Sequence, residues 1–157
     1  MKRTKEQLAG IYLRYKCQLD SLPEDMVEEF RNATLFVYNR LKRSGVRFEF
    51  TTIDPYKDLD ELTNDVCNNG EMKIYSGDDN SRLLPGALNL YSRAIHDWIH
   101  YFHQLPFGFD GEYQVYEIQK LLYPKHMWPL LYSEIVLQTA FFEVYGYFPE
   151  QKIIINI

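Results

Sequence analysis

The stretch NLYSRAIHDWIHYFHQLPFGFDGE, residues 89–112, combines a two-faced helical pattern with a chain reversal. On a helix, one face carries a polar stripe and the opposite face carries large apolar side chains such as Trp98. Proline and glycine then interrupt the pattern, as is typical of a turn between two helices. The stretch therefore predicts a helix over residues 87–103, a turn, and a second helix over residues 112–122. The polar stripe contains Asn89, Ser92, Arg93, His96, His100 and His103.

Most of the remaining chain also follows a helical period. Two short segments, VRFEFTTI and EMKIYSG, show the composition of strands and could pair as a small sheet, and KIIINI at the end resembles an edge strand or a docked arm. We therefore predict a mostly α fold, a compact helical domain of five to six helices with a small two- or three-stranded β element. Further helices are expected at residues 4–20, after SLPE through Leu41, at residues 55–67 and at residues 124–145.

Length and composition favour one packed domain. The 157 residues contain no internal repeat, low-complexity tract or linker, so we predict a single helical domain over residues 1–157. Hydrophobic residues make up 46% of the chain, which is the composition of a packed globule and not of a disordered segment.

The charge and the cysteines limit the classes of partner. A formal charge of -5 argues against nucleic acid as a partner, because binding to phosphate needs a surplus of Lys and Arg. No apolar run is long and clean enough for an integral membrane segment or a signal peptide. Cys17 and Cys67 are isolated and fit reduced thiols, so we expect a cytoplasmic protein. The expected partner is a small-molecule substrate or another protein, and the oligomeric state is left open.

His96 and His100 have the spacing of a metal-binding pair. Side chains at i and i+4 of a helix lie about 5–6 Å apart, close enough for two neutral imidazoles to bind one cation. Glu112 is the natural third ligand, because the turn after residue 103 can place the start of the next helix beside the stripe. The alternative is a solvated polar face, in which Glu112 simply favours the first turn of its helix on dipole grounds.

Glu134 lies in an otherwise apolar helical segment, where a carboxylate is costly to bury unless it meets a cation, a metal or hydrogen-bond donors. The functional interpretation is that Glu134 faces the histidines as fourth ligand or general base, with Gln138 hydrogen-bonding nearby. The alternative is a structural contact with a tyrosine hydroxyl or an arginine. Residues expected to support the metal ligands without binding the ion are Arg93, Gln138, His103 and Asn89.

The run His96-Asp97-x-x-His100, followed by eleven residues and Glu112, resembles the HDxxH-x11-E zinc motif of the coenzyme Q biosynthesis protein family, whose members are largely helical. The resemblance covers 17 residues. It implies a divalent metal held by these four residues and chemistry on a prenylated aromatic ring, such as C1 decarboxylation. Asp97 thereby joins Glu134 as a candidate catalytic residue, although from helix geometry Asp97 is a weaker ligand and could instead pair with Arg93.

A longer pattern is similar to a family of small helical proteins encoded by bacteriophages and mobile elements. It comprises Asn89-x3-Arg93-Ala94-Ile95-His96-Asp97, then Gly111-Glu112, then Glu134-x3-Gln138. That family has no settled activity. The resemblance implies that the polar residues of this pattern converge on one centre.

The leading hypothesis is a metal-dependent enzyme with one Zn²⁺ or Fe²⁺ held in a helical pocket by His96, His100 and Glu112. Zinc would suit hydrolysis, and iron would suit oxidative chemistry. In either case the expected substrate is a small molecule, for example one that contains an aromatic ring. One alternative is a non-enzymatic acidic interaction protein, for example a phage-encoded inhibitor of a host protein. It would act through an acidic, tyrosine-rich surface, with the loop 77–80 and the segment 54–65 supplying charge for a basic partner. Another is a metal-free site in which Glu134 and His96 share a proton.

Overall fold

The computed structural model describes residues 2–157, and the chain divides into two compact units. The terminal unit combines the N-terminal segment up to Met26 with Gly108–Ile157. The middle unit is the continuous segment Val27–Phe107. One domain over residues 1–157 stays a prediction.

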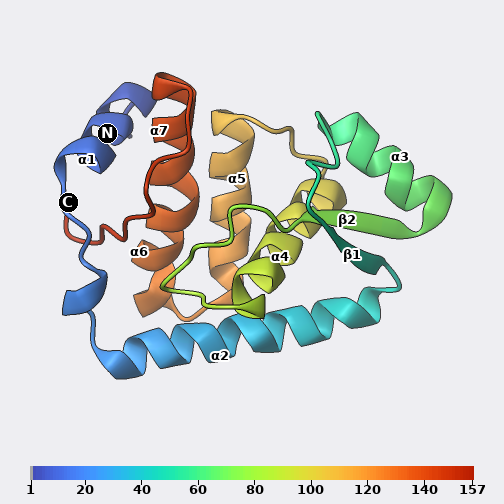
Figure 1. The fold of residues 1–157 in the computed structure, drawn as a ribbon, viewed down its shortest axis with the longest axis horizontal. Helices are drawn as coiled ribbons and strands as arrows, with labels where there is room; N and C mark the ends of the chain where they lie inside the picture. Colours follow the sequence, from blue (N-terminus) through green and yellow to red (C-terminus); the bar gives the residue numbers. More distant parts are fainter. Residues whose placement is uncertain (1) are drawn as a thin grey trace. The chain divides into compact units, whose positions relative to one another are not determined.

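The middle unit contains a two-stranded parallel sheet. Strands β1 (Arg47–Thr51) and β2 (Glu71–Tyr75) pair along their whole length and are joined by helix α3 (Leu59–Asn69) (Figure 1). Because side chains alternate across a strand, the sheet has one apolar face, on which Met72 and Ile74 are fully buried. The prediction that the two β segments pair is confirmed.

Helix α4 (Ala87–His103) packs against β2 and α3 within the middle unit. It lies between Gly86 and Gln104, which both have a positive φ, and its bounds are those expected from the sequence. Of the residues opposite the polar stripe, Ala94 is buried and Trp98 is half-buried, whereas Phe102 is 60% exposed; on the stripe itself, His100 is 1% exposed. The buried apolar residues of α4 are Ala94, Ile95 and Ile99.

Helix α2 (Glu24–Leu41) belongs to the middle unit from Val27 onward. Its Tyr38 ring stacks on Tyr91 of α4, with ring centroids 4.0 Å apart. The same Tyr38 ring also contacts Phe48 of β1. An aromatic cluster therefore joins α2, α4 and the apolar face of the sheet.

The terminal unit consists of helices, with α1 (Lys5–Arg14) packed on α7 (Gln138–Tyr145). Helix α6 (Trp128–Leu131), a π-helical segment (Tyr132–Leu137) and α7 form one continuous helical run, against which α5 (Phe109–Gln119) packs (Figure 1). The core of this unit includes Leu8, Tyr12, Leu130, Val136 and Ala140.

With that run counted as one, α1 to α5 and the run make six α-helices among residues 2–157, so the predicted mostly α class is confirmed. Short 3₁₀ turns occupy Leu19–Ser21, Lys42–Ser44, Lys120–Leu122 and Lys125–Met127. Several predicted bounds were wrong. The helix expected over residues 55–67 spans Leu59–Asn69, and the α-helix expected over residues 124–145 begins at Trp128. The helix expected over residues 112–122 begins at Phe109, where the Glu143 carboxylate accepts a hydrogen bond from the Phe109 N–H at 2.6 Å. The helix expected over residues 4–20 ends at Arg14.

The first helix ends early because the chain after it holds the C-terminal arm, residues 150–157. The Gln18 N–H donates to the Ile153 carbonyl at 2.7 Å, and the Gln18 side chain accepts from the Ile155 N–H. Ile153 and Ile154 are 1% exposed, and the Ser133 hydroxyl accepts from the Ile154 N–H. Of the two expectations for this tail, the docked arm is correct.

Within residues 2–157, no helix combines the length and the apolarity needed to cross a bilayer. Cys17 and Cys67 are both free thiols.

Candidate metal centre

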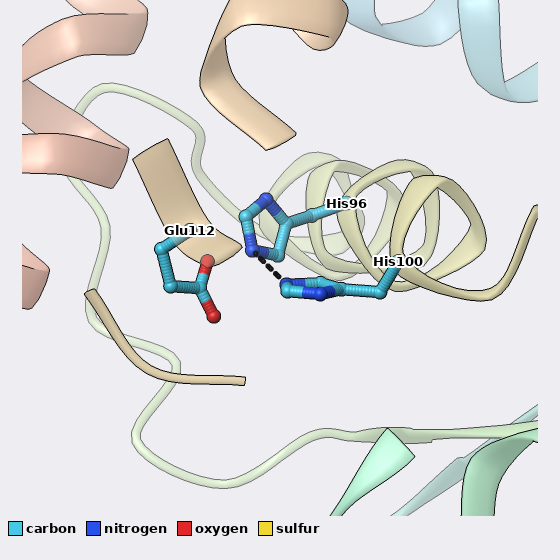
Figure 2. Close-up of side chains that lie close together, drawn as sticks. All are labelled: His96, His100 and Glu112. Atoms are coloured by element: carbon cyan, nitrogen blue, oxygen red, sulfur yellow. Dashed lines mark hydrogen bonds between the residues drawn. The ribbon is translucent and has the colours of Figure 1, made fainter. Parts of the chain in front are cut away.

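His96 and His100 lie one turn apart on α4 and turn their rings toward each other. Their Nε2 atoms are 3.2 Å apart, and the rings meet edge to face with centroids 4.8 Å apart (Figure 2). Two nitrogens bound to one tetrahedral zinc at about 2.0–2.1 Å would be separated by roughly 3.3 Å. The pair is therefore already spaced as two ligands of one ion.

The turn after α4 fixes the orientation of His100, which is 1% exposed. Its Nδ1 lies 2.8 Å from the Leu105 carbonyl oxygen, which can only accept a hydrogen bond. The proton of the neutral ring is therefore on Nδ1, and the Nε2 lone pair points toward His96. This is the usual arrangement of a metal-binding histidine, whose second ring nitrogen donates to a carbonyl or carboxylate.

Two further features hold this turn in place. Gln104 adopts a left-handed conformation with φ of 52°, and the Leu105 N–H then donates to the His100 carbonyl at 3.0 Å. The Phe107 ring meets the His100 ring edge to face, with centroids 5.1 Å apart. The backbone and an aromatic side chain therefore both restrict the rotation of the His100 ring.

Glu112 supplies a carboxylate from the first turn of α5. A ring nitrogen of His96, a ring nitrogen of His100 and a carboxylate oxygen of Glu112 all lie within 4.8 Å of one another (Figure 2). This group could hold a metal ion, and it consists of the three residues predicted as ligands. Two imidazoles and one carboxylate suit either Zn²⁺ or Fe²⁺, so the donor set does not define the ion.

The N-terminal part of the polar stripe binds a loop. The Arg93 guanidinium donates to three backbone carbonyls, those of Tyr75, Gly77 and Asp78, at 2.8, 2.6 and 3.0 Å. The Asn89 amide donates to the Asp79 carboxylate at 2.8 Å. Both side chains therefore hold the loop that follows β2.

Asp97 and His103 lie outside the metal-binding group. Asp97 is half-buried. The pKa of the nearby Tyr56 hydroxyl is raised, mainly by burial and then by the Asp65 carboxylate, and the negative charge of Asp97 adds a smaller contribution. His103 is exposed, and its ring contacts Phe102. Their predicted roles, catalytic for Asp97 and supporting for His103, stay predictions.

Glu134 lies in the π-helical segment and is half-buried. Its carboxylate accepts a hydrogen bond from the Gln151 amide at 2.7 Å. Burial raises the pKa of Glu134 to about 7, and the Gln151 hydrogen bond opposes that rise. Gln138, the first residue of α7, is also half-buried. The predicted role of Glu134 as fourth ligand or general base stays a prediction.

Two partners in these clusters were not predicted from the sequence. The Leu105 carbonyl that orients His100 is a backbone group and has no residue-type signal. Gln151 follows Glu134 by 17 residues in the C-terminal arm, and no spacing rule links the two. Comparisons of the chain with protein-family models, with curated proteins and with solved structures give no match.

Proposed function

We propose that the protein is a metal-dependent enzyme in which His96, His100 and Glu112 hold one divalent ion, Zn²⁺ or Fe²⁺. The observation that carries this proposal is the 3.2 Å separation of the two histidine Nε2 atoms, with the His100 lone pair directed by the Leu105 carbonyl. Three protein ligands leave coordination positions open, as in catalytic sites, whereas structural zinc sites are closed by four.

The chemistry proposed for this centre follows from its donor set. When bound, zinc would lower the pKa of a coordinated water for hydrolysis, and iron with open positions would support oxygen-dependent chemistry. Glu134 is proposed as the general base, because a base is most effective when its pKa lies near the working pH and the pKa of Glu134 is about 7. The motif resemblance favours a small substrate that contains an aromatic ring.

Elemental analysis of untagged protein, purified without chelator, tests the proposal. Wild type should contain about one equivalent of zinc or iron per chain, and His96→Ala and Glu112→Ala should lose it. His103→Ala is the matched control, because this exposed histidine lies on the same helix and should leave the metal content unchanged. Absence of metal from wild type after reconstitution with both ions, or full occupancy in His96→Ala, would contradict the proposal.

The metal requirement is tested separately from metal binding. Activity found in a screen of hydrolytic and oxidative substrates should disappear with chelator and return with the ion. Activity that is indifferent to chelator but lost in Glu134→Gln would instead support the metal-free acid–base site shared by Glu134 and His96.

A second candidate function, an acidic interaction protein, has one observation in its favour. Asp78 and Asp79 are exposed, and their loop is held by Arg93 and Asn89, so their charges are presented from a fixed backbone. This function predicts that capture of a basic protein partner survives His96→Ala. It also predicts that Asp78→Lys with Asp79→Lys weakens the capture, which the metal-dependent enzyme does not require.

A further inference from the structure

The outer edge of β2 is closed by side chains. The β2 backbone alternates, so Lys73 and Tyr75 direct their N–H and C=O groups away from β1. The Lys73 N–H donates to the Tyr56 hydroxyl at 2.9 Å, and the Tyr75 carbonyl accepts from Arg93 at 2.8 Å. Side chains therefore occupy the Lys73 N–H and the Tyr75 carbonyl at this edge, and covering an edge in this way is one means by which natural sheets avoid unwanted pairing.

The outer edge of β1 is not closed in this way. The Arg47 N–H donates to the Gly70 carbonyl and the Thr51 carbonyl accepts from the Ser76 N–H, so the odd-numbered residues of β1 face β2. The backbone N–H and C=O groups of Phe48 and Phe50 consequently point to the other side. Among residues 2–157, no group forms a hydrogen bond with them.

The residues of this open edge are self-complementary. The segment Val46-Arg47-Phe48-Glu49-Phe50 can pair antiparallel with a second copy of itself about a two-fold axis at Phe48. Arg47 then lies opposite the second copy's Glu49, and Glu49 lies opposite its Arg47. Phe48 of each copy forms the hydrogen-bonded pair at the centre, which uses the open N–H and C=O groups.

The neighbouring register lacks this complementarity. A two-fold axis at Glu49 would also use the open groups, but it would place the two Glu49 carboxylates directly opposite each other, which is unfavourable. Oppositely charged pairs across strands are stabilising, so the charges select the register centred on Phe48. Both charges are accessible to a second copy. Glu49 is exposed, and the Arg47 side chain is 69% exposed even though its guanidinium forms an ion pair with the Glu71 carboxylate, with Nη2 and Oε2 3.7 Å apart.

We propose that the outer edge of β1 is a homodimer interface, in which two copies of the chain form a continuous four-stranded sheet in the order β2, β1, β1 of the second copy, β2 of the second copy. Phe50 is 38% exposed, and in this arrangement its N–H can donate to the carbonyl of the second copy's Val46, while the Val46 N–H keeps its hydrogen bond to the Ser44 hydroxyl at 3.4 Å. The interaction is self-association by strand addition, and it does not depend on the proposed metal site.

Charge exchange tests this interface. Sedimentation velocity over a concentration series should show a monomer–dimer equilibrium for wild type. Arg47→Glu and Glu49→Arg should each weaken dimerisation by about tenfold, because each places like charges opposite one another at two symmetric positions. The double variant Arg47→Glu/Glu49→Arg restores both pairs with exchanged signs and should recover the wild-type affinity. Asp60→Arg, the same change of charge at an exposed position of α3, is the control and should have no effect.

Hydrogen exchange on wild type tests the same interface without relying on any variant. The amide of Phe48 should exchange more slowly as the protein concentration rises, whereas the amide of Lys73, already bonded to Tyr56, should not change. A wild type that is monomeric at every concentration would overturn the proposal. So would a dimer that is insensitive to both single variants, or one that the double variant does not restore.

Discussion

The two halves of the polar stripe on α4 differ in what surrounds them. In the first half, Arg93 and Asn89 direct their donors at the loop after β2, and the guanidinium alone binds three carbonyls. In the second half, His96 and His100 direct their Nε2 atoms at each other, and a carbonyl holds the proton of His100 on the far side of its ring. The helical period places all four side chains on one face, but the adjoining backbone determines which half is structural and which can bind an ion.

Removal of His100 should have the largest effect on the second half. His100→Ala deletes the ligand that the Leu105 carbonyl orients, so metal affinity should fall by more than about a hundredfold. Competition with a chromogenic chelator measures the change. Arg93→Ala should stay within about threefold of wild type in the same assay, since first-half interactions are not metal contacts. Equal losses in the two variants would remove the distinction between the halves.

Arg93→Ala should instead reduce stability. It deletes charge-assisted hydrogen bonds to the Tyr75 carbonyl at the end of β2 and to two carbonyls of the following loop, and we expect the free energy of unfolding of the metal-free protein to fall by about 2–4 kcal/mol. Urea denaturation of metal-free samples measures this. Under the same conditions His96→Ala should cost only about 1 kcal/mol. A larger loss of stability in His96→Ala than in Arg93→Ala would mean that the histidine half of the polar stripe is the structural one.

Glu134 gives a prediction about pH. Its pKa of about 7 in the folded protein lies above the ordinary value of 4.5, so the folded state holds its proton more tightly than the unfolded state. Protonated Glu134 therefore favours the folded state over the unfolded state relative to ionised Glu134. This stabilisation is fully present below about pH 4.5 and is lost as the pH rises through about 7. Glu134→Gln should therefore be more stable than wild type at pH 8, by about 1–3 kcal/mol, and equal to it near pH 4. If the free energies of unfolding of wild type and Glu134→Gln change in parallel between pH 4 and pH 8, the pKa of Glu134 is not raised in the folded protein.

Phe107 should have a smaller effect than a ligand. Its ring packs edge to face against His100, so Phe107→Leu should loosen the orientation of that ring and lower metal affinity by about three- to tenfold. Isothermal titration with zinc measures the change, and thermal denaturation of the metal-free variant reports any loss of fold. If the zinc affinity of Phe107→Leu equals that of wild type, the Leu105 carbonyl is sufficient to orient the His100 ring.

His103 should have the smallest effect. It is exposed at the end of the stripe, and His103→Ala should change stability by less than about 0.5 kcal/mol and leave metal affinity unchanged. Loss of metal in this variant would mean that the site extends further along α4 than the His96–His100 pair.

Local sequence signals were sufficient for α4 and for the choice of the three residues that could hold a metal ion. The apolar period between Gly86 and Gln104 gives the helix its bounds, and the spacing of His96 and His100 determines that their side chains share a face. Glu112 could be proposed because the residues between it and α4 include proline and glycine, which allow the chain to turn. These features depend only on neighbouring residues.

Features that depend on distant residues could not be predicted. Helix α1 ends at Arg14 because the following segment binds the C-terminal arm, and Phe109 begins α5 beside the Glu143 carboxylate. The carbonyls that engage Arg93 and His100 are backbone groups, which every residue carries, so they leave no signature in the sequence. The π-helical segment around Glu134 likewise has a composition that predicts an ordinary helix.

X-ray absorption spectroscopy of the metal-loaded protein identifies the atoms bound to the ion. We expect light-atom ligands at roughly 2.0–2.1 Å, with the outer-shell scattering of two imidazoles. In His96→Ala, the imidazole scattering of any metal that remains should fall to that of one ring. Coordination by oxygen alone, without imidazole scattering in wild type, would contradict the assignment of His96 and His100 as ligands.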